Sequence, residues 1–240
     1  GKPYSYVENV TQPTITVYRP SKKAVATPAV IVYPGGGFNV LAIDIEGTEI
    51  CDWLLSNGIA CVLLKYRVPC QHQGPYRECA SAHVDAQRAM SIVRSRAAEW
   101  RIDPHKIGVI GFSAGAHMAI MASTRFDRLY PAVDDADMTG SRPDFALVFY
   151  PGRVSGRKDS SPNPAIRVTD RTPPTFLFHT HEDTSVPPEN SIRFYQALVR
   201  AGEAERLLER YLRVLDGLLA GAPAGEIDVL TAAERRQILT

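Results

Sequence analysis

The sequence predicts an α/β domain with a mostly parallel central sheet that is flanked by helices on both faces. Short apolar runs rich in β-branched residues alternate along the chain with longer stretches of helical spacing, as in strands joined by crossover helices. The strand-like runs are apolar at consecutive positions, which central parallel strands require because both of their faces are buried. With 240 residues, the chain has the size of one large domain.

The expected strands are apolar segments that stop at turn-forming residues. The second of them, for example, stops at Pro34 and three glycines. In chain order the expected strands are Thr14–Tyr18, Ala29–Tyr33, Ile59–Tyr66, Ile107–Gly111, Phe145–Tyr150 and Thr175–His179.

The expected helices lie between these strands. Glu46–Ser56 ends at Asn57-Gly58, a favourable C-terminal stop. His83–Trp100 has apolar residues near helical spacing and is followed by Asp103-Pro104. Segments 125–142 and 152–174 are predicted to be long loops, which are uncommon unless they shape a binding site.

The overall composition is that of an ordinary globular protein, with 45% hydrophobic and 22% charged residues. The net charge of +1, with basic and acidic residues interleaved, argues against a nucleic-acid partner, which would need a basic stripe. No segment approaches the roughly 20 apolar residues of a membrane span, so no membrane partner is expected.

The four cysteines, at positions 51, 61, 70 and 79, lack the spacing of a zinc site. We expect buried free thiols, or a Cys70–Cys79 bridge if the protein is exported. The sequence therefore leaves open both the disulfide state and the compartment, whether secreted, periplasmic or cytoplasmic.

Residues 111–115 read Gly-Phe-Ser-Ala-Gly, a G-x-S-x-G pentapeptide between the apolar strand KIGVIG and the helix AHMAIMAS. Such a strand-to-helix turn strains the serine backbone, needs small neighbours and aims the hydroxyl out of the sheet. The helix N-terminus also favours the negative charge that develops during attack. Ser113 is therefore the predicted nucleophile; the alternative is a tight turn whose serine has no chemical role.

A glycine-rich turn, Tyr33–Phe38, directly follows an expected strand. Its three glycines let the backbone approach a ligand closely and present N–H groups. The turn lacks P-loop and dinucleotide-binding spacing, so phosphate binding is not expected. We predict that the N–H groups of Gly36 and Gly37, together with that of Ala114 after the nucleophile, bind an oxyanion.

Asp183 follows the run TFLFHT, where the acid of a Ser…Asp…His triad is expected. In that role it would fix the tautomer of a histidine and stabilise the imidazolium. Alternatively, Asp183 caps the helix that begins near Pro188.

Five segments together resemble the acetylxylan-esterase-like branch of the α/β-hydrolase superfamily, which is related to hormone-sensitive-lipase-type esterases. They are YPGGGF, LLKYRVP, DAQRAMSIVRSRAAEW, GFSAGAHMA and HEDTSVPPENSIRFYQAL, and the resemblance spans residues 4–202. It implies the α/β-hydrolase fold, acyl transfer through a serine ester and short-chain esters as substrates. Carried over by position, it assigns the nucleophile to Ser113, the acid to Asp183 and the oxyanion donors to Gly36, Gly37 and Ala114.

The catalytic histidine is not where the resemblance places it, on a loop that follows a further strand after residue 202. All six histidines, at 72, 83, 105, 117, 179 and 181, precede Asp183. His117 lies one helical turn after Ser113 and is expected to be structural. His181 is the candidate base, although its strand is expected about 10 Å from that of Ser113, at ~4.8 Å between neighbouring strands.

Residues 203–240 have helical composition, and one apolar stripe at helical spacing consists of Leu207, Leu208, Leu212 and Leu215. Residues 205–240, which include LTAAERRQIL, are similar to the end of a nonribosomal-peptide-synthetase condensation domain and its linker. We therefore predict an α/β-hydrolase domain over 1–202 that lacks the usual last strand, and a helical tail over 203–240. This tail would be either a junction of two reading frames or genes, or a lineage-specific helical end.

The predicted function is a serine carboxylesterase for short-chain, acetyl-type esters, with acetylated polysaccharide as a candidate substrate. The motifs imply no cofactor and no metal, and the expected partner is a small-molecule ester. Without a base, activity would be weak, because oxyanion donors and substrate binding alone accelerate the reaction only roughly 10³–10⁴-fold over its rate in water. The alternatives are a small-peptide serine hydrolase and a catalytically inactive binding protein. A homodimer through a sheet edge is also predicted, since loss of the last strand would expose that edge.

Overall fold

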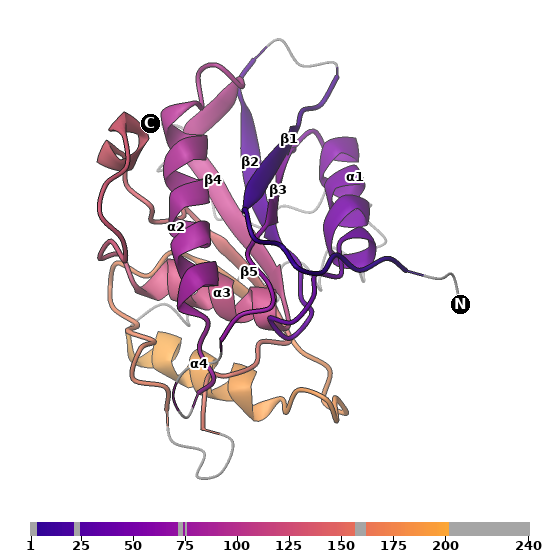
Figure 1. Ribbon diagram of the computed structural model, residues 1–240. Helices are drawn as coiled ribbons and strands as arrows, with labels where there is room; N and C mark the ends of the chain where they lie inside the picture. Colours follow the sequence, from indigo (N-terminus) through magenta and orange to yellow (C-terminus); the bar gives the residue numbers. More distant parts are fainter. Residues whose placement is uncertain (1–3, 22–24, 72–73, 75, 157–161, 202–240) are drawn as a thin grey trace, which may run out of the picture.

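The computed structural model describes residues 4–21, 25–71, 74, 76–156 and 162–201 (Figure 1). Within these ranges, a six-stranded sheet has the order β1-β3-β2-β4-β5-β6. β1 pairs antiparallel with β3, and the other neighbouring strands pair parallel. The strands are β1 (Thr14–Tyr18), β2 (Thr27–Tyr33), β3 (Ala60–Lys65), β4 (Ile102–Phe112), β5 (Ala146–Phe149) and β6 (Thr175–Phe178). This architecture confirms the predicted α/β fold.

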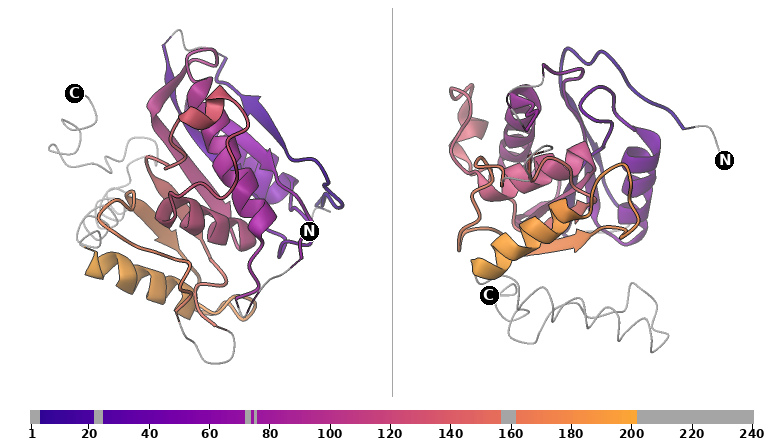
Figure 2. Two further views of the ribbon diagram at one scale, coloured as in Figure 1. Left: turned by 60° about the vertical axis from the view of Figure 1, so that its left-hand side comes forward. Right: turned by 90° about the horizontal axis from the view of Figure 1, so that it is seen from below.

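Helices follow β2, β3, β4 and β6 and cover the sheet on both sides (Figures 1 and 2). The α-helices are α1 (Glu49–Ser56), α2 (Ala80–Ser95), α3 (Ala114–Thr124) and α4 (Glu189–Arg200). A single π-helical turn, η1 (Asp44–Thr48), leads into α1, and a 3₁₀ turn, η2 (Asp135–Met138), interrupts the loop after α3.

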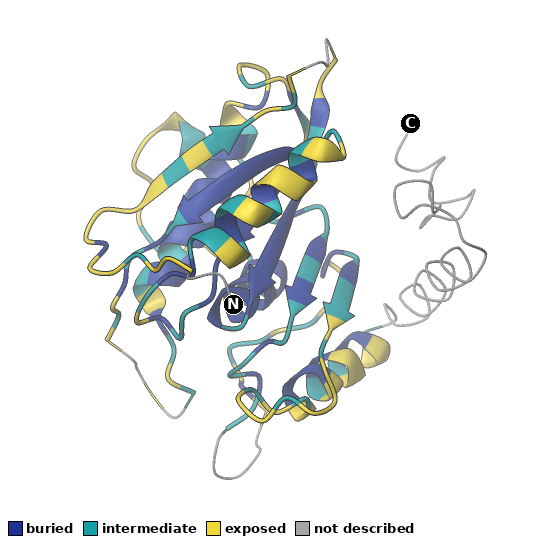
Figure 3. Ribbon diagram, turned by 90° about the vertical axis from the view of Figure 1, so that its right-hand side faces the viewer, coloured by how far each residue is buried: buried dark blue, intermediate teal, exposed yellow. Residues whose placement is uncertain are grey.

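The sheet separates two apolar cores. On one face, Met90 of α2, Ile120 of α3 and Phe194 of α4 belong to a buried cluster with alternate residues of the central strands. On the other face, Leu54 of α1 is buried with Val30 of β2. Figure 3 shows the central strands buried and the outward face of α1 exposed. Burial on both faces explains why these strands are apolar at consecutive positions.

The observed strands lie within two residues of the predicted ones, except that β4 begins at Ile102 instead of Ile107. The added residues, 103–106, are mostly polar and partly exposed, and the β2–β4 register shifts between Thr27 and Ala29. This irregularity accommodates Asp103-Pro104 within the strand, whereas the sequence pattern assigned the pair to the end of a helix.

Both predicted boundaries of the second helix are wrong, and turns explain the early end. α2 begins at Ala80 and ends at Ser95, before the predicted end at Trp100. Beyond it the chain turns: the Trp100 N–H donates to the Arg96 carbonyl at 3.0 Å, and Arg101 has φ of +53°. Ala97 and Trp100, which continue the helical spacing, therefore lie in turns and not in the helix.

The expectation of free thiols is wrong, because all four cysteines are paired. Cys51 on α1 bonds to Cys61 on β3, with Cα atoms 5.2 Å apart. Cys70 and Cys79 close the loop before α2, with Cα atoms 5.9 Å apart. The first pair was missed because it depends on α1 packing against β3, which the spacing of cysteines does not reveal.

The predicted helical tail over 203–240 and the absence of the usual last strand lie outside the described residues and stay predictions. Within the described part, β6 is the outer strand at the edge opposite β1. Among the described helices, none is long and apolar enough to cross a bilayer.

Candidate active site

Ser113 occupies the turn between β4 and α3 in a backbone conformation that L-residues rarely adopt. Its φ is +51° and its ψ is −112°. A residue held in such a region costs on the order of 1–3 kcal/mol and persists only where its surroundings fix it. Here the Ser113 N–H donates to the Phe149 carbonyl of β5 at 3.0 Å, and its own carbonyl accepts from the His117 N–H at 3.2 Å. The strain predicted from the pentapeptide is therefore observed at Ser113.

The glycines on either side of Ser113 allow this turn to pack tightly. A Cβ on Gly111 would collide with the Gly115 carbonyl, and a Cβ on Gly115 would collide with the Tyr33 carbonyl at the end of β2. In both cases the obstacle is backbone, which cannot rotate away. The first turn of α3 thus lies directly against β2 and β4, as the need for small neighbours predicted.

The glycine loop after β2 leaves its predicted oxyanion donors unused. Gly36 and Gly37 have φ of +126° and +67°, conformations that favour glycine. No described residue accepts a hydrogen bond from the N–H groups of Gly36, Gly37 or Ala114. These N–H groups are therefore free to bind a ligand.

The carbonyls of the same peptide groups are occupied. The Gly35 carbonyl accepts from the Ala42 N–H at 3.0 Å, and the Gly36 carbonyl accepts from the N–H groups of Asn39 and Val40 at 3.0 and 3.2 Å. Because hydrogen bonds in a chain polarise one another, these contacts strengthen the N–H donors on the other side of each peptide.

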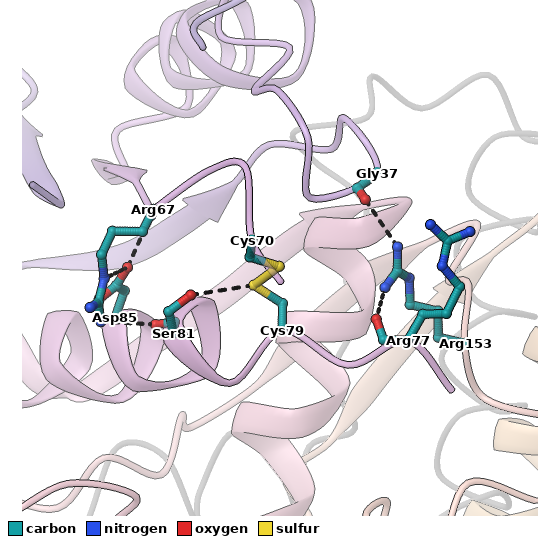
Figure 4. The surroundings of a disulfide bond; sticks show 8 residues. All are labelled: Gly37, Arg67, Cys70, Arg77, Cys79, Ser81, Asp85 and Arg153. Atoms are coloured by element: carbon teal, nitrogen blue, oxygen red, sulfur yellow. Dashed lines mark hydrogen bonds and ion pairs between the residues drawn. A yellow bond between two sulfur atoms is a disulfide. The ribbon is translucent and has the colours of Figure 1, made fainter. Parts of the chain in front are cut away.

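Side chains from other elements fix the glycine loop from outside. The buried Tyr66 hydroxyl donates to the Pro34 carbonyl at 2.7 Å, and the Gly35 N–H donates to Glu46 Oε2 at 2.7 Å. Arg153 Nη2 donates to the Gly37 carbonyl at 3.0 Å, as Figure 4 shows. Sequence reasoning missed these three side chains, since nothing in the local pattern separates them from ordinary strand, helix and loop residues.

Asp183 lies in the turn after β6, with β5 between that strand and β4. Its Oδ1 accepts from the N–H groups of Ser185 and Val186 at 2.9 and 2.8 Å, and its Oδ2 lies 3.6 Å from His179 Nε2. Asp183 thus shapes its own turn. The alternative that it caps the following helix is wrong, because the N-cap of α4 is Pro188.

The structure does not join His181 to Ser113 by a hydrogen bond. His181 is exposed, and none of the described residues is its hydrogen-bond or ion-pair partner. The neighbouring His179 is held elsewhere, with Nδ1 2.7 Å from Ser191 Oγ and Nε2 2.8 Å from the Val186 carbonyl. The role of His181 as the base therefore stays a prediction that requires movement of this turn.

His117 is fully buried beneath the glycine loop. Its ring centroid lies 5.3 Å from that of His83, and both rings meet Phe38 edge-on. Burial lowers the pKa of His117 well below its ordinary value, and burial lowers the pKa of His83 to about 4. Both imidazoles are thus neutral near pH 7, in keeping with the structural role predicted for His117.

Tyr150, directly after β5, is a further residue that the sequence did not single out. Its φ is +41°, and its hydroxyl donates to Glu46 Oε1 at 2.8 Å. Burial, followed by the negative charges of Glu46 and Asp183, raises the pKa of Tyr150. The phenol is therefore protonated and can act only as a neutral donor.

The strand order and the strained turn at Ser113 are those of an α/β-hydrolase. The BD-FAE family model matches residues 15–147, and the chain belongs to this family. This match includes the glycine loop and Ser113, whereas Asp183 lies beyond it. Among the described residues, no three His, Cys, Asp or Glu side chains gather as metal ligands would.

Individual esterases and hydrolases show the same relationship. The chain is 31% identical over 198 residues to the acetylxylan esterase of Xylanibacter ruminicola, an alignment that covers 72% of this chain and 38% of that protein. It is 35% identical to the acetyl ester-xyloside bifunctional hydrolase of Caldicellulosiruptor lactoaceticus, with a TM-score of 0.69, over 81% of this chain and 75% of that one. For the propionate-bound esterase Est2 of Thermogutta terrifontis, identity is 25% and the TM-score is 0.65, over 84% and 79% of the two chains.

The chain thus spans well under half the length of the Xylanibacter ruminicola protein. These relatives support the predicted resemblance to acetylxylan-esterase-like hydrolases. They give no support to a condensation-domain origin of residues 205–240.

Proposed function

We propose that this chain is a serine carboxylesterase that hydrolyses short-chain, acetyl-type esters through an acyl-enzyme on Ser113. The observation that carries the proposal is the juxtaposition of Ser113, at positive φ, with the glycine loop. Gly35 lies between them: a Cβ on this residue would be 3.2 Å from Ser113 Cβ. The hydroxyl-bearing turn and the unused N–H groups of Gly36 and Gly37 therefore belong to one site.

In the proposed reaction, Ser113 Oγ forms a bond to the ester carbonyl carbon while its proton passes to a base. The carbonyl oxygen becomes an oxyanion, to which the N–H groups of Gly36, Gly37 and Ala114 donate. Collapse breaks the bond to the alcohol, which leaves with a proton, and an acyl ester remains on Ser113. Water then attacks this ester, releases the carboxylic acid and restores the hydroxyl.

Asp183 is the proposed acid of the triad, and His181 is the candidate base. The position of Asp183 after β6 supports this role. The exposure of His181 and the intervening strand β5 require that the turn move before His181 can reach Ser113. Without a base in place, we expect weak turnover, since the oxyanion donors and substrate binding alone accelerate the reaction only roughly 10³–10⁴-fold over its rate in water.

Acetyl groups on a plant polysaccharide are the proposed natural substrate. This substrate class comes from the acetylxylan esterase and the acetyl ester-xyloside hydrolase among the relatives. The propionate bound to the Thermogutta terrifontis esterase is in keeping with a short acyl group.

A catalytically inactive binding protein of the same fold is the second candidate function. It is favoured by the lack of any hydrogen bond between Ser113 and a histidine in the described part of the chain. In that case the oxyanion loop, which is the glycine loop Tyr33–Phe38, would bind a carbonyl or carboxylate ligand without turnover.

A homodimer formed through the edge of the sheet is a separate proposal. β6 is the outer strand of the described sheet, and its last residue, Phe178, is 50% exposed. Light scattering at high protein concentration tests this proposal, and a strictly monomeric particle would contradict it.

Hydrolysis of p-nitrophenyl acetate and butyrate by the parent, Ser113→Ala and His181→Ala tests the esterase proposal. Loss of turnover in both variants would identify His181 as the base. Loss in Ser113→Ala alone would indicate a serine-dependent esterase without that base. Equal rates in all three proteins would reject the esterase and leave the binding protein.

A further inference from the structure

We propose that Glu46 and Tyr150 form a positioning pair that fixes the oxyanion loop against the carboxyl end of β5. This inference rests on the proposed esterase function and adds to it two residues that act through the backbone of the loop. Glu46 belongs to the π-helical turn η1, and Tyr150 follows β5, so their contact joins parts of the chain 104 residues apart.

The Glu46 carboxylate uses both of its oxygens in this arrangement. Oε2 accepts from the Gly35 N–H at 2.7 Å, and Oε1 accepts from the Tyr150 hydroxyl at 2.8 Å. A carboxylate that accepts two well-aligned hydrogen bonds has few rotamers left and acts as a rigid bridge.

This bridge lies next to the nucleophile. A Cβ built on Gly35 would lie 2.5 Å from Glu46 Oε2 and 3.2 Å from Ser113 Cβ. The carboxylate and the serine side chain therefore border the same small space, which only glycine leaves open.

The Pro34–Gly35 peptide is fixed on both sides. Its carbonyl accepts from the buried Tyr66 hydroxyl, and its N–H donates to Glu46. The next two peptides carry the N–H groups of Gly36 and Gly37. Since glycine is conformationally permissive, each of these peptide planes keeps its direction only where a hydrogen bond holds it. The carbonyls of Gly35 and Gly36 accept from Ala42, Asn39 and Val40, and Glu46 holds the peptide before them. Loss of the Glu46 contact would therefore free the first peptide of the loop and loosen the direction of the donors that follow it.

Tyr150 connects this bridge to the far side of the site. Its N–H donates to the Phe178 carbonyl of β6 at 2.7 Å, while its hydroxyl reaches Glu46. Hydrogen bonds through the pair thus connect the oxyanion loop to the ends of β5 and β6, and the turn with Asp183 follows β6.

A negative charge beside a developing oxyanion opposes catalysis, so the charge of Glu46 is not the useful property. The Glu46 carboxylate instead acts by accepting two hydrogen bonds in fixed directions. Glutamine can reproduce both contacts without the charge: its Oε1 accepts from Gly35, and its Nε2 donates to Tyr150 Oη. Alanine can reproduce neither, so these two replacements separate geometry from charge.

The test compares kcat and KM for p-nitrophenyl acetate in the parent, Glu46→Gln, Glu46→Ala and Tyr150→Phe. We expect Glu46→Ala to lower kcat about 100-fold with little change in KM, as for loss of one oxyanion donor. Tyr150→Phe, which leaves the Gly35 contact in place, should lower kcat about tenfold, whereas Glu46→Gln should stay within about threefold of the parent. Glu49→Ala is the matched control, because Glu49 is an exposed carboxylate one turn further along the chain.

Two kinetic outcomes overturn the inference. Parental kcat in Glu46→Ala would show that the bridge is not needed. A fall in Glu46→Gln as deep as that in Ser113→Ala would instead identify Glu46 as a base. The rate at which a fluorophosphonate labels Ser113 should follow the same order of variants.

A parent that neither turns over nor labels at Ser113 would reject the proposed function, and hydrogen exchange would then decide the positioning role alone. We expect the amides of residues 35–42 to exchange faster in Glu46→Ala than in the parent, Glu46→Gln and Glu49→Ala. Equal exchange in all four proteins would overturn the positioning role.

Discussion

The guanidinium of Arg153 lies over the ring of Phe38, 4.6 Å from its centroid. Arg153 also donates through Nη2 to the Gly37 carbonyl at 3.0 Å and through Nη1 to the Arg77 carbonyl (Figure 4). One side chain from the loop after β5 thus contacts two consecutive residues of the oxyanion loop and the loop before α2. Its planar fork suits this task, because lysine offers a single point charge instead.

We predict that Arg153→Lys and Arg153→Ala lower kcat for p-nitrophenyl acetate by about tenfold or more, because each loses the fork that fixes the Gly37 carbonyl. Arg101→Ala is the control, since Arg101 is exposed and precedes the start of β4, whereas Ser113 follows its opposite end. Full activity in Arg153→Lys would show that positive charge alone is sufficient.

The two disulfides are predicted to differ in their effect on activity. The Cys70 N–H donates to the Phe38 carbonyl at 3.0 Å, and Arg77 between the paired cysteines accepts from Arg153. Cys51 and Cys61 join α1 to β3 and belong to the other apolar cluster of the sheet, whereas Phe38 belongs to the cluster beneath α2 and α3.

Replacing either pair with alanines should lower the free energy of unfolding by about 2–3 kcal/mol, as expected for short closed loops. Only Cys70→Ala/Cys79→Ala should also lower kcat, measured at a temperature where both variants remain folded. Equal kcat values in the two double variants would contradict the proposed coupling between this loop and the oxyanion donors.

Gly115→Ala is predicted to be among the most damaging single substitutions in the described part of the chain. Its Cβ would enter the Tyr33 carbonyl, so α3 would have to move away from β2. We expect a loss of about 3 kcal/mol or more in the free energy of unfolding, measured in urea. Gly140→Ala is the matched control, because a Cβ there meets nothing within 4 Å. Similar stabilities of the two variants would refute the close contact.

The sequence predicted those parts of the molecule that are encoded over a few neighbouring residues. The strand-turn-helix context of Ser113 is local, and so are the glycines that the turn requires. Consecutive apolar residues similarly identified strands buried on both faces. A local pattern failed where a polar segment bulges within a strand, as at Asp103-Pro104 in β4.

The supporting contacts of the site could not be predicted in this way. Glu46 and Tyr150 meet only because β2, β4 and β5 end at the same edge of the sheet. The Cys51–Cys61 bond similarly depends on how α1 packs. Such contacts depend on the order of strands in the sheet, for example on the position of β3 outside β2. The spacing of residues along the sequence does not encode this order.

The buried pair His83 and His117 is predicted to make stability depend on pH. Burial lowers the pKa of His83 to about 4, whereas an unfolded imidazole has a pKa of about 6.5. Below about pH 6.5 the unfolded state therefore binds more protons than the folded state. The free energy of unfolding keeps its full value above that pH and falls as the pH approaches 4.

From His83 alone we expect a loss of about 2 kcal/mol between pH 7 and pH 5, and the lowered pKa of His117 adds to it. Urea unfolding at the two pH values measures this loss. His83→Leu should flatten the dependence, since leucine cannot bind the proton that destabilises the folded state. His105→Gln should not, because His105 is exposed on β4. An unchanged pH dependence in His83→Leu would show that the acid sensitivity arises at other groups, such as carboxylates that must be protonated on unfolding.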